Sequence, residues 1–408
     1  MIGQKVVTGL DIGTSSIVAA LARIDRLGRI SSVEIVQSRS EGIDRGLLTD
    51  LEKLTTAIQS VIQSLQSKTK TKISDVYINI NGNYITTRHS HAAIPLLNRA
   101  NNAVGLRDIR KVNNQARLLG LKLEEEVIHE FPQSYTIDEH NKVKNPLGLY
   151  GRKLEVDLYL ILSRISQIDN LVKSVNQAGL EVTDIELSGL ATSLAILDAK
   201  KRQEGCILID IGAGTTEILI FKDNVLREVA ILSFAGNDIT EAIVSKFKLP
   251  FELAEDIKKS YGLACSKDVK DNREVLIKQN SAYKPIQQKL ICELIESKVG
   301  KLISLIKTKI NNSAYRGQIN SGIVITGGTA LLPGLLEKIE SELGIPVRLG
   351  RIKNVNFPAT KMPLYATAIG LIHYGIDKSI NKHFKLSTDK NLFFRFLDRV
   401  KEVYQEYF

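Results

Sequence analysis

The sequence has few cysteines, no long apolar run and no lysine-containing phosphate loop. Each of these absences argues against one class of protein. Its three cysteines, Cys206, Cys265 and Cys292, form an odd number without paired spacing, which favours reduced thiols over disulfides or a metal site. No segment approaches the roughly 20 apolar residues of a transmembrane helix. The opening residues, MIGQKVVTGL, lack the apolar region of a signal peptide. We therefore expect a cytoplasmic protein.

Two common nucleotide-binding classes are disfavoured by missing residues. No GxxxxGK(S/T) loop is present, and a GxGxxG motif beginning at Gly212 would need glycine where Glu217 stands. The net charge of +10, from 55 basic and 45 acidic residues, is spread along the chain without a basic run. We interpret this charge as a solvated surface and expect no nucleic-acid partner.

The residues that are present indicate a folded α/β protein. A chain of 408 residues, 43% hydrophobic and 25% charged, is long enough for more than one domain. Short runs rich in Val, Ile and Leu alternate with longer helical patterns. Helices are predicted at residues 51–67, 106–119, 168–178 and 289–310.

Two distant segments are nearly the same. Residues 9–25 read GLDIGTSSIVAALARID, and residues 207–223 read ILIDIGAGTTEILIFKD. Each is an apolar run, then Asp-Ile-Gly, then a small hydroxylated turn and a second apolar run, which predicts a β-hairpin. The repetition predicts two structurally similar halves.

The turns of these hairpins have the composition of phosphate-binding loops. Glycine lets the backbone approach an anion closely, successive N–H groups form an anion-binding concavity, and hydroxyl groups add donors. One copy alone would be interpreted as an ordinary hairpin, whereas two matched copies favour a phosphate clamp. The predicted phosphate-binding residues are Gly13, Thr14, Ser15, Ser16, Gly212, Ala213, Gly214, Thr215 and Thr216.

An aspartate precedes each turn, at Asp11 and Asp210. A carboxylate beside a phosphate is repelled by about 4 kcal/mol at ~4 Å and an effective dielectric constant of ~20. A hydrated Mg²⁺ reverses the sign of this interaction. The paired aspartates therefore predict a magnesium–polyphosphate ligand, with the metal held through water.

A third glycine-rich element, GIVITGGTALLPG, spans residues 322–334. It predicts a strand that runs into Gly327 and Gly328, followed by a helix after Pro333. The glycine pair would let a flat base and its sugar lie against the backbone. Taken alone, the element is equally an ordinary strand–turn–helix junction.

In this order, the three elements resemble the actin-fold ATPases, which include actin, the sugar kinases and the heat-shock chaperones. The resemblance implies that the turns hold the phosphates of ATP and that Asp11 and Asp210 hold hydrated Mg²⁺. Residues 251–262, FELAEDIKKSYG, are similar to the helix beside the adenine and ribose in that superfamily. The residues implied on the adenosine side are Gly236, Glu255, Lys258, Gly327, Gly328 and Thr329.

One block narrows the resemblance to the bacterial cell-division FtsA family. His129, Pro132, Tyr135 and Asp138 match the family's HxxPxxYxxD pattern, and Pro-Leu-Gly follows at residues 146–148. The resemblance implies an α/β fold that is actin-like (ribonuclease H-like), duplicated and two-lobed, with an inserted α+β subdomain and a C-terminal amphipathic helix. We interpret the inserted subdomain as an interaction module and His129 as a packed side chain.

Domain boundaries are predicted from these motifs. The first lobe takes residues 1–83 and 162–204, the inserted subdomain 84–161, the second-lobe core 205–233 and 306–375, the second-lobe small subdomain 234–305, a flexible linker 376–390, and the amphipathic helix 391–408.

The final segment, NLFFRFLDRVKEVYQEYF, places apolar residues at helical spacing with charged residues mostly opposite. A charge on every turn forbids a bilayer crossing but permits a helix in the interface plane. From residue 390 onward, four basic residues face three acidic ones and the terminal carboxylate, so attraction to anionic lipid is weak. A helix that packs on its own core or on a partner is the alternative. The predicted membrane-facing residues are Phe393, Phe396, Leu397, Val400, Val403, Tyr404 and Tyr407.

The resemblance implies an ATP-binding protein that polymerises and tethers the division ring to the inner face of the membrane. Its implied partners are copies of itself, later division proteins at the inserted subdomain, and the C-terminal peptide of tubulin-like FtsZ at Lys298 and Lys301.

The alternatives are a sugar or carboxylate kinase of the same fold and a pilus-assembly adaptor. A kinase needs a general base near the γ-phosphate, and only Glu217 offers a carboxylate near the second turn. We expect slow ATP turnover at most.

Overall fold

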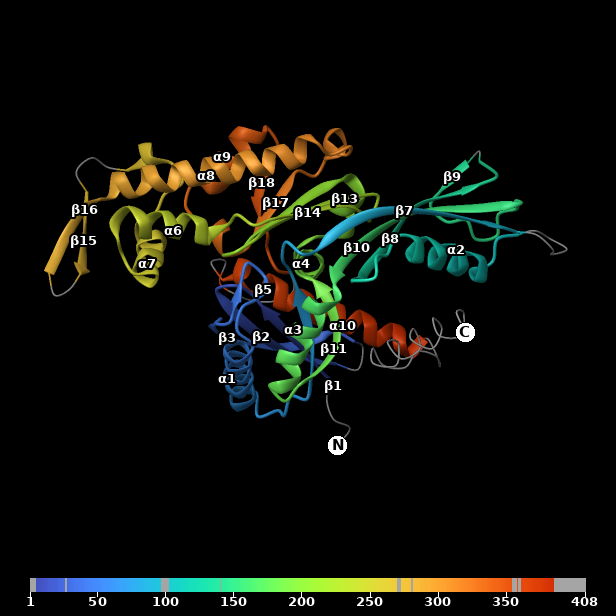
Figure 1. Cartoon of the computed structure of the whole chain (residues 1–408), viewed down its shortest axis with the longest axis horizontal. Coiled ribbons are helices and arrows are strands. Elements are labelled where there is room, and N and C mark those ends of the chain that lie inside the picture. Colours follow the sequence, from blue (N-terminus) through green and yellow to red (C-terminus); the bar gives the residue numbers. More distant parts are fainter. Residues whose placement is uncertain are drawn as a thin grey trace.

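The structure, a computed structural model, describes residues 5–25, 28–96, 103–139, 141–269, 273–279, 282–353, 358 and 361–384. Figure 1 shows two large bodies, each built on a five-stranded sheet, and a smaller sheet that projects to the right. The helices predicted at residues 51–67, 106–119, 168–178 and 289–310 are present, as α1, α2, α3 and α8, whereas the helix predicted at residues 391–408 lies outside the described residues.

The first lobe is built on a sheet with the strand order β11-β6-β1-β2-β3. Its first three strands form an antiparallel meander, and β6 and β11 add in parallel beside β1. Most positions of β1 and β2 are buried, because both faces of this part of the sheet are covered. The strands are Lys5–Ile12 (β1), Ser16–Ile24 (β2), Ile30–Arg39 (β3), Asp75–Ile80 (β6) and Glu181–Leu187 (β11), with a small hairpin of Ile43–Asp44 (β4) and Leu47–Leu48 (β5).

The second lobe repeats this arrangement in the order β14-β13-β12-β17-β18. The hairpin registers match as well, since Asp11 pairs with Val18 in one lobe and Asp210 pairs with Glu217 in the other. The predicted duplication is therefore confirmed, with Glu217 as a chemical difference between the halves. The strands are Cys206–Ile211 (β12), Thr216–Lys222 (β13), Val225–Leu232 (β14), Ile323–Thr326 (β17) and Val347–Leu349 (β18).

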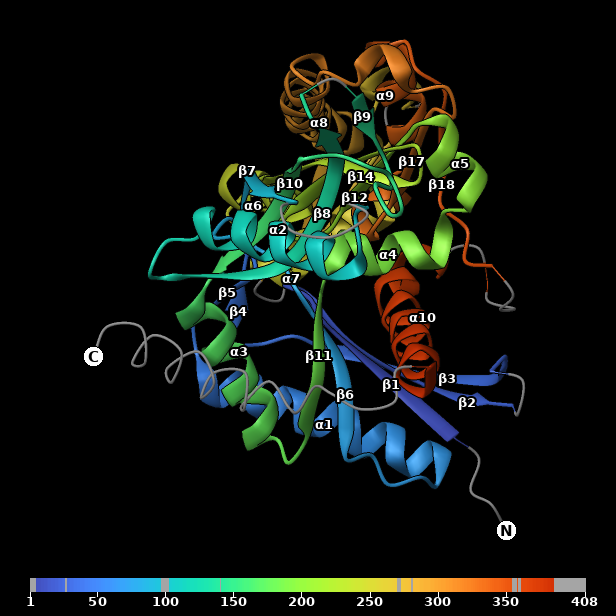
Figure 2. The ribbon, with the colours of Figure 1, turned by 90° about the vertical axis from the view of Figure 1, so that its right-hand side faces the viewer.

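The projecting sheet has the antiparallel order β7-β10-β8-β9, and α2 covers one of its faces (Figures 1 and 2). Val112 and Ala116 of α2 are fully buried against the sheet. Asp108 caps the helix, since its carboxylate accepts a hydrogen bond of 2.8 Å from the backbone N–H of Gly105. The elements are Thr86–Pro95 (β7), Glu125–Ile137 (β8), Asn141–Val143 (β9), Lys153–Arg164 (β10) and Leu106–Leu119 (α2).

Helices cover both large sheets. In the first lobe, α1 begins at Asp50, whose carboxylate accepts from the N–H of Lys53, and its apolar stripe around Ile58 packs on β2 and β3. In the second lobe, α6, α7 and α8 pack together beyond the sheet, and a β-hairpin extends from them (Figure 1). The remaining elements are Leu51–Thr69 (α1), Ile165–Gln177 (α3), Ser188–Ile196 (α4), Ala199–Glu204 (α5), Gly236–Phe247 (α6), Phe251–Tyr261 (α7), Glu274–Gln279 (β15), Ala282–Gln287 (β16), Gln288–Asn311 (α8) and Leu335–Leu343 (α9).

Helix α10 (Met362–Phe384) corrects two of the predicted boundaries. Residues 362–375 were placed in the second lobe, but α10 packs mainly on β1, β2 and β6 of the first lobe and crosses α4. Residues 376–384 were predicted as linker, but they continue this helix. Ile376 is buried in the first-lobe core, and Lys378 pairs with Asp184 of β11 at 3.0 Å. These two contacts hold the segment against the first lobe as a helix, although its polar composition predicted a linker.

Candidate functional site

The two repeated turns lie next to each other between the lobes. Each is closed by a backbone hydrogen bond, from the N–H of Gly13 to the carbonyl of Ser16 (3.1 Å) and from Gly212 to Thr215 (2.9 Å). A Cβ atom added to Gly214 would lie only 2.6 Å from the Thr14 hydroxyl oxygen. The fold therefore brings together two glycine turns that lie far apart in the sequence.

The hydroxyl groups of the second turn are used within the protein. The Thr215 hydroxyl accepts a hydrogen bond of 2.8 Å from the Asn81 side-chain amide, and the Thr216 hydroxyl donates to the carbonyl of Phe234 at 2.8 Å. Both threonines are buried. The Thr216 hydrogen is therefore used within the protein, whereas the Thr215 hydroxyl, which accepts here, keeps a hydrogen that it can donate.

Three carboxyl groups cluster beneath the turns. Asp11 accepts a hydrogen bond from the Asn79 amide at 2.8 Å, and Asp210 accepts one from the Thr192 hydroxyl at 3.1 Å. Glu217 is fully buried, and one of its oxygens accepts from the N–H of Gly189 at 2.6 Å. Its other oxygen has no hydrogen-bond partner within the part of the chain that the structure describes.

Burial makes the carboxyl groups of this cluster hard to ionise. Desolvation raises the pKa of Asp11 to about 7, with a further contribution from the charge of Asp210. Desolvation also raises the pKa of Asp210 to about 6 and raises that of Glu217 well above its usual range. Each group is therefore costly to ionise without a nearby positive charge. Carboxylate, amide and hydroxyl oxygens are the donor set that suits Mg²⁺.

The adenosine-side residues converge on the second turn. Gly236 donates its N–H to the carbonyl of Gly212 at 3.1 Å, and the Thr329 hydroxyl donates to the same oxygen at 2.7 Å. The ammonium of Lys258 lies 3.0 Å from the Gly236 carbonyl and 2.6 Å from Glu255. Glu255 and Lys258 therefore form an ion pair beside the turn, and burial lowers the pKa of the lysine.

Steric contacts explain why the first residue of the glycine pair is glycine. Gly327 has a φ angle of +87°, and an added Cβ would meet the Ile211 backbone and lie 2.5 Å from the carboxyl oxygen Oδ1 of Asp210. Gly328 begins a short 3₁₀ helix, Gly328–Leu331. The third predicted element thus adjoins the same aspartate as the second turn.

Several residues of the site carry no motif in the sequence. Asn79 is the next-to-last residue of β6. Its side-chain oxygen accepts from the N–H of Ile12 at 2.6 Å, and its NH₂ group donates to Asp11 and to Ser188. Thr192 reaches Asp210 from the middle of α4. These contacts join segments that are distant in the chain, so no local pattern could have indicated them.

Contacts between the two lobes lie beside the turns, and sequence reasoning did not predict them either. The Arg45 guanidinium donates to the carbonyl of Ser233 at 2.6 Å and pairs with Asp238 at 3.2 Å. Arg39 of β3 pairs with Glu252 of α7 at 2.7 Å, but both side chains are exposed, so this pair adds little stability. Charged residues of the first lobe thus bind the second lobe on both sides of the turns.

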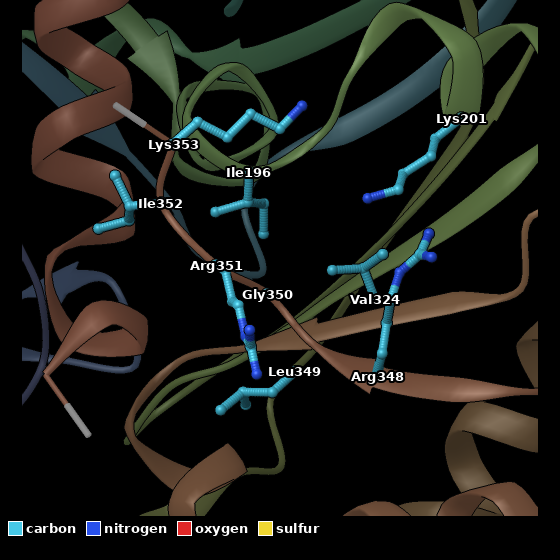
Figure 3. Close-up of a pocket in the computed structure, with 9 residues that line it drawn as sticks. All are labelled: Ile196, Lys201, Val324, Arg348, Leu349, Gly350, Arg351, Ile352 and Lys353. Carbon is cyan, nitrogen blue, oxygen red and sulfur yellow. The ribbon is translucent and has the colours of Figure 1, made fainter. Parts of the chain in front are cut away.

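A separate cavity of about 410 Å³ lies at the other end of α4. Figure 3 shows Ile196 of α4 facing Val324 and Ile352, with the ends of Lys201, Lys353 and Arg348 around them. Lys201 and Lys353 both pair with Asp198, at 3.5 and 3.3 Å. This cavity shares α4 with the carboxyl cluster but is lined by none of the predicted nucleotide-binding residues.

The remaining predicted residues lie elsewhere. Lys298 and Lys301 are one turn apart on α8, and the Lys301 ammonium lies 4.9 Å from the centre of the Phe234 ring. The predicted membrane-facing residues, from Phe393 to Tyr407, are outside the described residues. Among the helices that the structure describes, none is both long and apolar enough to cross a bilayer.

The duplicated sheets, facing turns and paired aspartates define an actin-like ATPase fold. Solved structures agree: the chain is similar to a PilM-PilN type IV pilus biogenesis complex, with a TM-score of 0.63, 17% identity, and coverage of 91% of this chain and 98% of the other. It is also similar to MreB5 of Spiroplasma citri bound to ADP, with a TM-score of 0.55, 14% identity and coverage of 94% and 99%. At these identities the likeness shows the fold alone.

Sequence relatives identify the family. The family model "Cell division protein FtsA" matches residues 207–370, and "SHS2 domain inserted in FTSA" matches residues 82–162. Cell division protein FtsA of Pseudomonas aeruginosa is 31% identical over 379 residues, covering 92% of this chain and 90% of the relative. The Escherichia coli relative of the same name is 29% identical over 389 residues, with 93% and 92% covered. The chain belongs to the FtsA family of actin-like cell-division proteins.

Proposed function

We propose that the protein binds Mg²⁺-ATP between its lobes, polymerises, and anchors the FtsZ ring to the inner face of the cytoplasmic membrane at the division site, where it recruits later division proteins. The carboxyl cluster of Asp11, Asp210 and Glu217 beneath two glycine turns supports the nucleotide part most directly. Family membership supports the division part. The Discussion gives the test of nucleotide binding.

The proposed ligand contacts are those that the family resemblance implies, and the closeness of the two turns supports them. Backbone N–H groups of the two turns would hold the phosphates, Asp11 and Asp210 would hold Mg²⁺ through water, and Gly236, Glu255, Lys258 and Gly327–Thr329 would border the adenosine. When bound, Mg²⁺ would neutralise charge on the phosphates and on both aspartates. Glu217 is a poor general base, because its raised pKa favours the protonated carboxyl and one of its oxygens is bound to Gly189. We therefore propose slow hydrolysis at most.

The two alternative functions are not favoured. A small-molecule kinase would need an acceptor-side base, and the carboxylate nearest the second turn is unsuited to that role. A pilus-assembly adaptor would share only the fold with this chain, since the PilM-PilN likeness rests on 17% identity. The sequence match of residues 82–162 to the domain inserted in FtsA favours the FtsA function over both alternatives.

The double variant K298E/K301E is expected to weaken binding of an FtsZ C-terminal peptide about tenfold. Both ammonium groups lie on one face of α8 without an ion pair in the described residues, so they are available to an acidic peptide. Retention on immobilised peptide would measure the effect, with K173E/K309E as a control of equal charge change. Equal retention of both variants would remove these lysines from the contact, and no retention of the parent protein would remove the FtsZ proposal.

Ending the chain at Lys390 is expected to lower vesicle binding at least tenfold. Full burial of one large apolar side chain stabilises by roughly 1.5–3 kcal/mol, and seven are predicted on the membrane-facing side of the tail. Co-sedimentation with vesicles, compared with sedimentation in their absence, separates lipid binding from polymerisation. Equal vesicle-dependent pelleting of both chains would contradict a role of the tail in anchoring.

A further inference from the structure

The exposed apolar side chains of the described residues gather in the inserted subdomain. Ten large apolar residues are at least one-third exposed, and seven of them lie between residues 106 and 150. Such a concentration on one small body marks a contact surface rather than the scatter that is normal for soluble domains. The seven residues are Leu106, Leu118, Leu119, Leu123, Leu147, Leu149 and Tyr150.

The outer surface of α2 and the residues just after it combine four of these leucines with unpaired positive charge. Arg107, Arg110 and Lys111 line a shallow groove of about 470 Å³ along the helix, together with Asn114, Gln115 and Leu118. Within the described part of the chain, none of the three cations has an ion-pair partner. The acidic residue of the helix, Asp108, is turned inward as its N-terminal cap. We call Leu106, Arg107, Arg110, Lys111, Leu118, Leu119 and Leu123 the α2 face.

Helix α2 and the C-terminal end of α10 lie on the same side of the molecule (Figures 1 and 2). Both α2 and the C-terminal end of α10 point to the right in Figure 1 and face the viewer in Figure 2. The tail that follows α10 is predicted to bind the membrane, but it is nearly neutral from residue 390 onward, with four basic residues against three acidic ones and the terminal carboxylate. The cationic residues of the α2 face can supply the attraction to anionic lipid that the tail lacks.

We propose that the α2 face binds an anionic phospholipid surface as a second membrane contact, an inference that rests on the proposed membrane function. Arginine and lysine side chains would lie at the headgroup level, and the leucines before and after them would enter the interface. A lipid surface fits because the helical part of the face has no exposed acidic group and its apolar and cationic residues lie along one open surface of α2. An acidic protein partner or a second copy of the chain is a competing outcome of the test.

The test uses the full chain and vesicles of phosphatidylcholine, with or without phosphatidylglycerol. R107Q/R110Q/K111Q is expected to lower binding to phosphatidylglycerol vesicles about tenfold and to leave the weaker phosphatidylcholine binding unchanged. The control K173Q/K246Q/R316Q removes three exposed charges elsewhere and is expected to change binding less than twofold. L118Q/L119Q, compared with L276Q/L290Q, tests the apolar part in the same assay. If each α2 variant melts at the same temperature as its control variant, both are folded.

The outcomes separate this inference from the tail proposal. If the α2 variant binds anionic vesicles like its control, the inference is overturned, even when truncation at Lys390 abolishes binding. If truncation has no effect but the α2 variant still loses binding, the tail proposal fails and the lipid contact of α2 stands. If the α2 variant keeps lipid binding but loses vesicle-independent sedimentation, the face joins copies of the chain and the lipid inference is wrong.

Discussion

Replacing Asp210 by asparagine is expected to weaken Mg²⁺-dependent ATP binding by about 10- to 100-fold while it stabilises the nucleotide-free protein. The loss follows from removing one of the two carboxylates proposed to hold the hydrated metal, an interaction with a charged group of about 1.5–3 kcal/mol. The gain follows because an ionised Asp210 is desolvated in the fold and lies near Asp11 and Glu217. Asparagine keeps an oxygen for the Thr192 hydroxyl and carries no charge.

The same groups predict how stability depends on pH. Because burial raises the pKa of Asp210 from its ordinary value of 3.8 to about 6, the folded state holds this proton more tightly than the unfolded chain does. Its contribution is fully present below pH ~4 and is lost as the pH rises through ~6, which amounts to about 1–3 kcal/mol. The nucleotide-free parent should therefore lose stability from acidic to neutral pH more steeply than D210N does.

Titration of ATP with and without Mg²⁺, together with thermal unfolding across this pH range, measures both effects. D169N changes an exposed aspartate of α3 and serves as the control. Unchanged Mg²⁺-dependent affinity in D210N would contradict the proposed clamp. A D210N protein less stable than the parent at neutral pH would contradict the electrostatic account of the carboxyl cluster.

The variant G370A is expected to destabilise the protein by about 3 kcal/mol or more, since overpacking a helix crossing forces the backbone apart. Gly370 lies on α10 where it crosses α4, and an added Cβ would overlap the carbonyl oxygen of Ala191. The helices would have to separate, and α4 carries Thr192 and Gly189, which bind Asp210 and Glu217. Weaker nucleotide binding should therefore accompany the loss of stability.

Gly300 offers a matched control for this variant. It also lies inside a helix, α8, but an added Cβ would meet no atom within 4 Å. G300A is therefore expected to stabilise by about 0.5–1 kcal/mol, as alanine does in a helix interior. Urea unfolding of both variants measures the difference. If G370A proved as stable as G300A, the close approach of α4 and α10 would not be a constraint on the fold.

The sequence by itself determined those structural elements that are formed by contiguous residues. Each β-turn-β element carries its own apolar strands, its aspartate and its glycine turn, so the local pattern predicts a hairpin wherever it occurs. The helical stripes of α1, α2, α3 and α8 were predicted for the same reason. Because the pattern occurs twice, the duplicated sheets and the carboxylates at Asp11 and Asp210 could be predicted before any contact was known.

Only the tertiary structure decided which distant groups complete the site and where the last helix belongs. Asn79, Thr192 and Arg45 act on residues far along the chain, and a contact between such positions leaves no periodicity or spacing in the sequence. The polar composition after Ile376 indicated a linker, but burial of that one side chain and the ion pair of Lys378 with Asp184 keep the segment in α10. Long-range burial and pairing depend on how the lobes pack, and that packing exists only in the folded chain.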